Sequence, residues 1–124
     1  MLKPRKPLPT SRRNERAKSH LRPTSEKALV KRIIRQLRKA PDTWVKKRRG
    51  DMAGSGEPDI ERIRLGHVTM LEVKLPGLDA TPLQRRVMVQ LLRAGATVAV
   101  VHSVEEALDA AARGDSDASE EIIP

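Results

Sequence analysis

Two carboxylates and one lysine have types and spacing that could support cleavage of a phosphodiester bond. Asp59 precedes Glu72 by thirteen residues, and Lys74 follows within the run Leu71–Leu75. Side chains alternate along a strand, so Glu72 and Lys74 should share one sheet face, opposite their apolar neighbours. Charged groups gathered on one sheet face are costly unless something binds them. A divalent cation and a phosphate would be suitable partners.

These residues fit the requirements of a hydrolytic site that uses Mg²⁺. Asp59 and Glu72 could supply carboxylate oxygens, and the backbone carbonyl of Val73 could add a third, because Mg²⁺ prefers oxygen ligands. Lys74 could orient or deprotonate the attacking water, or stabilise the developing negative charge. A Glu-x-Lys pair alone is more often a solvated ion pair. The prediction therefore rests on the combination of groups.

Two predicted helices each place one polar side chain within an apolar stripe. Ser25 can cap a helix over residues 25–39, with Glu26 at the centre of its stripe. A second helix over residues 81–95 has Gln84 in its first turn, where an amide could bind a ligating carboxylate, a water or a phosphate. An acid in a first turn is also favoured by the helix dipole alone. The stripes consist of Leu29, Val30, Ile33, Ile34 and Leu37 in the first helix, and of Leu83, Val87, Met88, Leu91 and Leu92 in the second.

The remaining elements predict an α/β fold. Short alternating runs at 43–47, 60–64 and 68–75 are typical of strands, and the last two should form a hairpin. The continuous apolar run at 96–101 is typical of a buried central strand. A capping box begins a last helix over 103–113. The order α-β-β-β-α-β-α favours a mixed central sheet flanked by helices on both faces.

Charge divides the chain into three parts. The net charge is +9, and residues 1–24 hold eight Lys or Arg against one acid. We therefore expect a basic disordered arm at 1–24, a folded domain at 25–113 and an acidic flexible tail at 114–124. The basic excess favours a polyanionic partner such as DNA. The candidate contacts to DNA are Arg12 and Arg13 in the arm, with Arg48 and Arg49 in a glycine-rich loop.

Composition excludes several classes of protein. The chain has no Cys, which rules out disulfides and thiolate metal sites. It has no apolar run near the roughly 20 residues that cross a bilayer, and no apolar stretch behind its basic N-terminus. We therefore expect no membrane association and a cytoplasmic location. Trp44 is the single aromatic residue, so stacking platforms for single-stranded nucleic acid cannot be built.

The ordered motifs resemble those of the VRR-NUC domain, a branch of the PD-(D/E)xK nuclease superfamily. The resemblance covers roughly residues 25–110 and is more specific than any one motif. The matching segments are 54–60, 71–77, 81–84, 93–95 and 98–103.

The resemblance implies a restriction-endonuclease-like αβββαβ core with a site that depends on Mg²⁺ or Mn²⁺. By motif position, Asp59 and Glu72 match the metal ligands and Lys74 the catalytic lysine. Gln84 and Glu26 match polar residues of the two helices. The chain departs from the pattern at its residue 57, a glutamate where small or apolar residues are common.

Stand-alone members of this family, of the phage or prophage type, resemble Holliday-junction resolvases that act as homodimers. We therefore expect a structure-selective DNA endonuclease that nicks branched DNA as a homodimer, in the cytoplasm of a bacterial host. The alternatives are a non-catalytic basic DNA-binding module, and a general or restriction-type nuclease.

Overall fold

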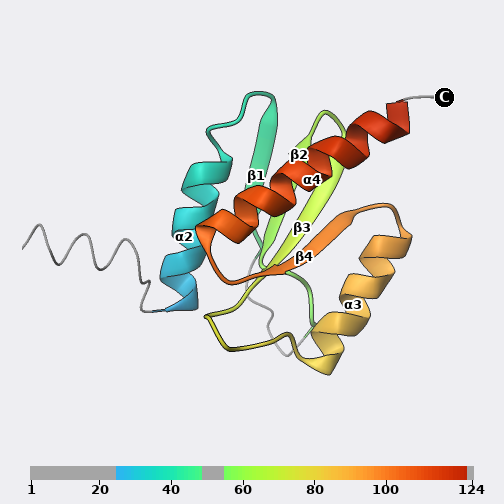
Figure 1. Cartoon of the computed structure of the whole chain (residues 1–124). Helices are drawn as coiled ribbons and strands as arrows, with labels where there is room; N and C mark the ends of the chain where they lie inside the picture. Colours follow the sequence, from blue (N-terminus) through green and yellow to red (C-terminus); the bar gives the residue numbers. More distant parts are fainter. Residues whose placement is uncertain (1–24, 49–54, 123–124) are drawn as a thin grey trace, which may run out of the picture.

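Four strands form one mixed sheet in the computed structural model of the protein, which describes residues 25–48 and 55–122 (Figure 1). Three helices pack around this sheet within those residues. None of these helices has the length and apolar character needed to cross a membrane. The elements are α2 (Glu26–Leu37), β1 (Thr43–Lys47), β2 (Ile60–Arg64), β3 (His67–Val73), α3 (Pro82–Arg93), β4 (Thr97–Val101) and α4 (Val104–Ile122).

The strands lie in the order β1-β2-β3-β4. The β1–β2 and β2–β3 pairs are antiparallel, and the β3–β4 pair is parallel. The predicted α/β fold with a mixed sheet is confirmed. The prediction that the 96–101 run forms a central strand is wrong, because β4 lies at the margin of the sheet and β3 is central. Helices α3 and α4 both contact β4, so apolar side chains on this strand have partners even though no strand among the described residues lies on its outer side.

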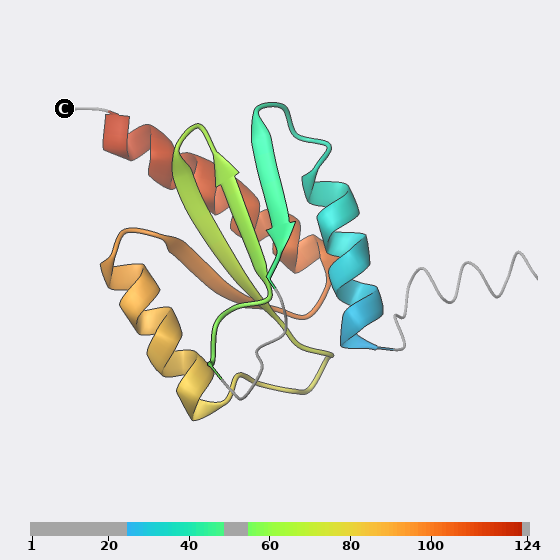
Figure 2. The ribbon, with the colours of Figure 1, turned by 180° about the vertical axis from the view of Figure 1, so that it is seen from behind.

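The two faces of the sheet are covered differently. Helices α2 and α4 pack on one face and enclose the hydrophobic core (Figure 1). Helix α3 lies beside β4, and in the view from behind no helix among the described residues lies in front of β1, β2 or β3 (Figure 2). The core side chains contributed by the strands are Val45, Ile60, Leu71, Val73 and Val101.

Helix α2 follows its sequence pattern closely. Ser25 caps it, since its Oγ accepts a hydrogen bond from the Ala28 N–H at 3.0 Å. Every residue of the predicted apolar stripe is buried. The periodicity therefore predicted both the helix and the face that it buries.

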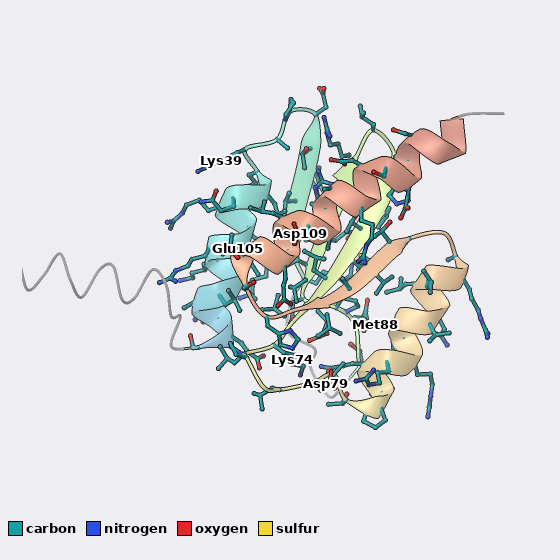
Figure 3. The ribbon with its side chains drawn as sticks, viewed as in Figure 1. Lys39, Lys74, Asp79, Met88, Glu105 and Asp109 are labelled. Carbon is teal, nitrogen blue, oxygen red and sulfur yellow. The ribbon has the colours of Figure 1, made fainter. Side chains whose placement is uncertain are left out.

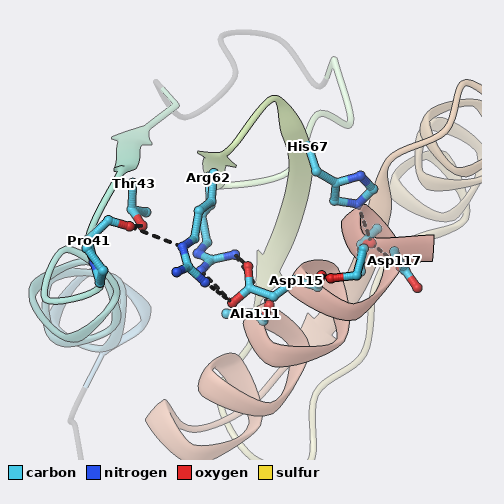
Figure 4. Close-up of polar contacts among 10 residues, drawn as sticks. Pro41, Thr43, Arg62, His67, Ala111, Asp115 and Asp117 are labelled. Atoms are coloured by element: carbon cyan, nitrogen blue, oxygen red, sulfur yellow. Dashed lines mark hydrogen bonds and ion pairs between the residues drawn. The ribbon is translucent and has the colours of Figure 1, made fainter. Parts of the chain in front are cut away.

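Helix α4 is longer than its sequence predicts. The expected end at Arg113 is wrong, because the helix continues through Gly114 to Ile122. Asp115 accepts hydrogen bonds from the buried guanidinium of Arg62 and from Arg64 (Figure 4). Burial alone would raise the pKa of Asp115, but the two arginines hold it below its usual value.

A second polar contact secures the same end of α4. Thr97 donates its hydroxyl hydrogen to Asp117 Oδ2, and His67 Nε2 lies 2.8 Å from Thr97 Oγ1 (Figure 4). Gly114 lies against Thr69, and a Cβ at Gly114 would approach Thr69 Oγ1 to 2.2 Å. The sequence suggested that the acids after Arg113 are solvated. Asp115 and Asp117 instead attach α4 to the sheet.

Candidate functional site

The predicted acids and lysine meet where β2 begins and β3 ends. Asp59 directly precedes β2, Glu72 is the penultimate residue of β3, and Lys74 directly follows that strand. The Asp59 N–H donates to the Leu71 carbonyl at 3.0 Å, which places Asp59 beside Glu72. Asp59 Oδ2 accepts a hydrogen bond from the Val73 N–H at 2.7 Å. Figure 3 shows Lys74 at this end of the sheet.

Glu72 is a buried acid without a full set of partners. Its side chain is 2% exposed, and Oε1 has no hydrogen-bond partner. Burial, followed by the hydrogen bond and negative charge of Asp59, raises the pKa of Glu72 to about 8. The positive charge of Lys74 opposes this increase, and the negative charge of Glu26 adds to it. Glu26, at the start of α2, is thus brought electrostatically close to the two acids.

The Val73 carbonyl is directed toward Asp59. The Lys74 N–H donates to the Val101 carbonyl of β4 at 3.0 Å. Successive residues of a strand direct their backbone groups to opposite edges, and both groups of one residue share an edge. The N–H and C=O of Val73 therefore point away from β4, to the edge where the Asp59 carboxylate lies. This direction suits the predicted backbone ligand.

The donor set fits a hard divalent cation that keeps part of its water shell. Among residues 25–48 and 55–122, no three His, Cys, Asp or Glu side chains converge as a complete metal site. Two carboxylates and one carbonyl are nevertheless the partial set with which Mg²⁺ is commonly held in sites that also bind phosphate. A cation would also partner the Glu72 oxygen that has no hydrogen bond. The residues present therefore fit Mg²⁺ or Mn²⁺.

Gln84 has a structural contact that its predicted role did not include. Its Oε1 accepts the Thr81 N–H at 2.8 Å, and its own N–H donates to Thr81 Oγ1 at 3.1 Å. This reciprocal pair is a capping box at the start of α3. The Thr-x-x-Gln spacing carries that signature, which the functional interpretation overlooked. Only the Nε2 side of the amide could donate to a ligand.

Gly56, shortly before Asp59, packs closely against α3. Gly56 has a φ of +76°, and a Cβ there would lie 2.8 Å from Leu83 Cγ and 3.1 Å from the Leu83 carbonyl oxygen. Pro58, between Gly56 and Asp59, is fully buried. A larger residue at position 56 would therefore push the Asp59 backbone away from α3.

Arg48, a predicted DNA contact, pairs with two acids beside the site. Its guanidinium donates to Glu61 Oε1 at 2.9 Å and also pairs with Glu57. Its backbone N–H donates to the Asp59 carbonyl at 2.7 Å. Glu57, the departure from the family pattern, is thus part of an ion pair beside the site. The other predicted DNA contacts, Arg12, Arg13 and Arg49, lie outside the described residues.

His102 contacts the segment that follows Lys74. Its Nε2 lies 2.9 Å from the Leu78 carbonyl, and its Nδ1 lies 3.1 Å from Glu106 Oε1. The hydrogen bond to Glu106 is the largest cause that raises the pKa of His102, and the bond to Leu78 is the next. Both acceptors are satisfied only by the imidazolium, which donates from both nitrogens. No local pattern predicted this contact, because His102 and Leu78 are 24 residues apart.

Comparison with known proteins supports the family suggested by the motifs. No protein-family model matches the chain, and no curated protein matches it. A solved structure described as a VRR_NUC domain matches with 25% sequence identity and a TM-score of 0.56, over 68% of this chain and 90% of that chain. The described fold is therefore that of a VRR-NUC domain, as the order of the motifs predicted.

Proposed function

We propose that the protein is a metal-dependent DNA endonuclease that hydrolyses phosphodiester bonds, with branched DNA such as Holliday junctions as its substrate. The observation that carries this proposal is the buried Glu72 carboxylate, which lacks a partner for Oε1 and lies beside Asp59 within a VRR-NUC fold. A buried acid pair of this kind lowers stability unless a cation compensates it. Its presence is most easily explained by cation binding.

Each residue of the site has a distinct role in this proposal. Asp59, Glu72 and the Val73 carbonyl hold Mg²⁺ or Mn²⁺. The cation, when bound, would polarise the phosphate and lower the pKa of a coordinated water. Lys74 is half-buried beside Glu72, where its ammonium group can orient the attacking water or neutralise charge on the phosphate. Glu26 adds negative charge near Glu72, and Gln84 can donate from Nε2.

The protonation state of Glu72 couples cation binding to pH. With a pKa of about 8, Glu72 holds its proton near neutral pH in the absence of a cation. A carboxylate must release that proton before it can act as a ligand. Cation affinity should therefore increase as the pH rises toward and beyond 8, and each binding event should release a proton.

Cleavage of a labelled four-way junction tests the proposal. The protein should nick the junction in the presence of Mg²⁺ or Mn²⁺, and chelation should abolish the reaction. Asp59→Asn should lose activity, whereas the exposed substitution Glu105→Gln on α4 should retain it. Symmetric nicks near the branch point would support junction resolution, and cleavage of linear duplex at the same rate would indicate a general nuclease.

The main alternative makes a different prediction in the same assay. A non-catalytic DNA-binding module would bind the junction in a salt-dependent manner and leave it intact under every cation. Cleavage confined to one duplex sequence would instead indicate a restriction-type enzyme. The proposed setting is the cytoplasm of a bacterial host, with a homodimer positioned to cut two strands of a symmetric junction.

A further inference from the structure

The outer edge of β4 lacks the residue types that usually protect an edge strand. β4 is the last strand in the sheet order, and its sequence Thr97-Val-Ala-Val-Val101 contains neither proline nor charge. Natural edge strands usually carry such residues, or are covered, because an open edge recruits other strands. The three central residues of β4 are only half-buried. The sequence of β4 therefore contains nothing that would block pairing with a further strand.

The outward backbone groups of β4 belong to Val98 and Val100. The Val101 carbonyl accepts from Lys74 in the β3 direction, so Val101 and Ala99 turn their backbone groups toward β3. Because this direction alternates along a strand, Val98 and Val100 present their N–H and C=O groups at the free edge. These groups could form hydrogen bonds with another strand.

Helix α3 also carries apolar side chains that the sheet does not bury. It packs against β4, yet it contains no buried residue. Leu83, Val89 and Leu92 are 40%, 45% and 60% exposed. In Figure 2 the helix lies beside β4, at the margin of the sheet. An extension of the sheet beyond β4 would bring more apolar surface toward α3.

A groove runs between this edge and α4. It has a volume of about 490 Å³ and is lined by Val98–Val101, Ala110 and three charged residues of α4. The helix runs back along β4, because its residue Glu106 contacts His102 beyond the end of the strand and Asp117 contacts Thr97 at the start. The groove is therefore acidic near the end of β4 and basic near its start. The charged residues are Glu106, Asp109 and Arg113.

We propose that this edge binds β4 of a second copy of the chain, antiparallel, about a two-fold axis at Ala99. Val98 of each copy then lies opposite Val100 of the other, and the pair exchanges its backbone hydrogen bonds. Ala99 meets Ala99 of the second copy, and its small side chain lets the two copies approach closely. The product is one continuous sheet in which β4 has a neighbour on each side.

The charges of the groove select this partner. A two-fold axis reverses the order of residues, so Arg113 of one copy faces Glu106 and Asp109 of the other, and the reverse contact forms at the same time. Helix α4 contacts both β3 and β4. Two such helices would lie about two strand spacings apart, roughly 10 Å, which is close to the distance at which helices pack.

The interface gives the proposed nuclease its partner and therefore rests on the proposed function, but its test needs neither DNA nor metal. A monomer that cleaves junctions would overturn the interface and leave the nuclease assignment intact. A chain that dimerises through this edge but never cleaves DNA would support the interface and overturn the nuclease assignment.

Sedimentation equilibrium of the full chain, across a dilution series, provides the test. The wild-type chain should form a dimer. The substitutions Arg113→Glu and Asp109→Arg should each raise the dissociation constant of the dimer by about tenfold or more. A homodimer of either variant places like charges opposite each other across the two-fold axis. An equimolar mixture of the two variants should dimerise again, since each then faces the opposite charge. Lys39→Glu, the same charge change at an exposed site away from β4, is the matched control.

A second variant tests the backbone pairing. Val100→Pro removes an N–H that points away from β3, so the fold of one copy should survive while the dimer is lost. Circular dichroism would verify that the variant is folded. A wild-type chain that stays monomeric at all concentrations would overturn the proposal. So would a dimer that none of these substitutions weakens, which would place the contact on another surface, such as the sheet face that carries Trp44.

Discussion

Asp59 holds the end of the strand that carries Glu72 and also raises the pKa of that glutamate. Its Oδ2 accepts the Val73 N–H at 2.7 Å, while its hydrogen bond and its charge add to burial in raising the pKa of Glu72 to about 8. The Asp59 carboxylate thus holds the backbone of Val73 in place. It also makes the ionised form of Glu72 unfavourable when no cation is bound. This relationship leads to a prediction about stability.

The free energy of unfolding without a divalent cation should fall as the pH rises. The pKa of Glu72 is about 8 in the folded protein and near 4.5 when it is unperturbed. A group whose folded pKa is raised contributes stability that is complete below the unfolded value and is lost as the pH passes through the folded value. Glu72→Gln should remove this loss, which we expect to be on the order of a few kcal/mol.

Urea denaturation from acidic to weakly alkaline pH measures this effect. Mn²⁺ should restore stability to the wild-type protein at alkaline pH and have little effect on the Glu72→Gln variant. Parallel pH profiles for the two proteins would show that Glu72 is not the group responsible.

The segment between Lys74 and α3 should be held more firmly at mildly acidic pH. The pKa of His102 is raised and that of Glu106 is lowered, chiefly by the hydrogen bond between them. The raised His102 pKa stabilises the fold below about 6.5 and loses this effect as the pH rises through the folded value. The lowered Glu106 pKa contributes above about 4.5 and is lost as the pH falls through the folded value.

Hydrogen exchange of residues 75–80, corrected for intrinsic rates, can detect this. Protection should be greater near pH 5.5 than near pH 8.5, and His102→Ala should remove the difference. Equal protection in the two proteins at both pH values would mean that His102 does not hold the segment.

Gly114→Ala should destabilise the protein although alanine favours helices. The added Cβ would lie 2.2 Å from Thr69 Oγ1, so α4 or β3 would have to move. Overpacking of this kind costs about 1–3 kcal/mol. Thermal unfolding would measure the change, with the exposed Ser116→Ala in the same helix as control. A second substitution, Thr69→Ala, should recover part of the loss, and a more stable Gly114→Ala protein would contradict the close packing.

Asp115→Ala should cost far more stability than the loss of an exposed ion pair. It would leave Arg62, which is 3% exposed, without its carboxylate partner, and such a loss costs about 3–5 kcal/mol. The pair of Arg85 and Asp79 is 57% and 71% exposed, so Arg85→Ala should cost at most about 1 kcal/mol. Chemical denaturation of both variants makes the comparison, and similar losses would refute the anchoring role of Asp115.

Local patterns predicted the parts of the fold that local chemistry determines. Strands 43–47 and 60–64 and the buried stripe of α2 agree with the structure because side-chain alternation and helical periodicity are written in adjacent residues. The position of β4 could not be predicted in this way. An apolar strand has the same sequence whether another strand or a helix covers it.

Long-range contacts explain what the sequence did not reveal. The extension of α4 depends on Arg62 and Arg64, about fifty residues before Asp115, so the acids alone suggested a solvated tail. The ion pairs of Arg48 with Glu57 and Glu61 likewise join residues that are nine and thirteen positions apart, so no adjacent residues indicated them. The motif order placed Asp59 and Glu72 together, but only the structure shows the Glu72 oxygen without a partner.

The rate at which Lys74→Ala cleaves a labelled four-way junction tests the central claim most directly. Measured under single-turnover conditions with saturating Mg²⁺, the rate should fall by about 100-fold or more relative to wild type, with junction binding retained. Lys39→Ala, at an exposed position, should cleave at the wild-type rate. Cleavage by Lys74→Ala at the wild-type rate would contradict the site, and a wild-type protein that binds the junction without cutting it would contradict the nuclease activity itself.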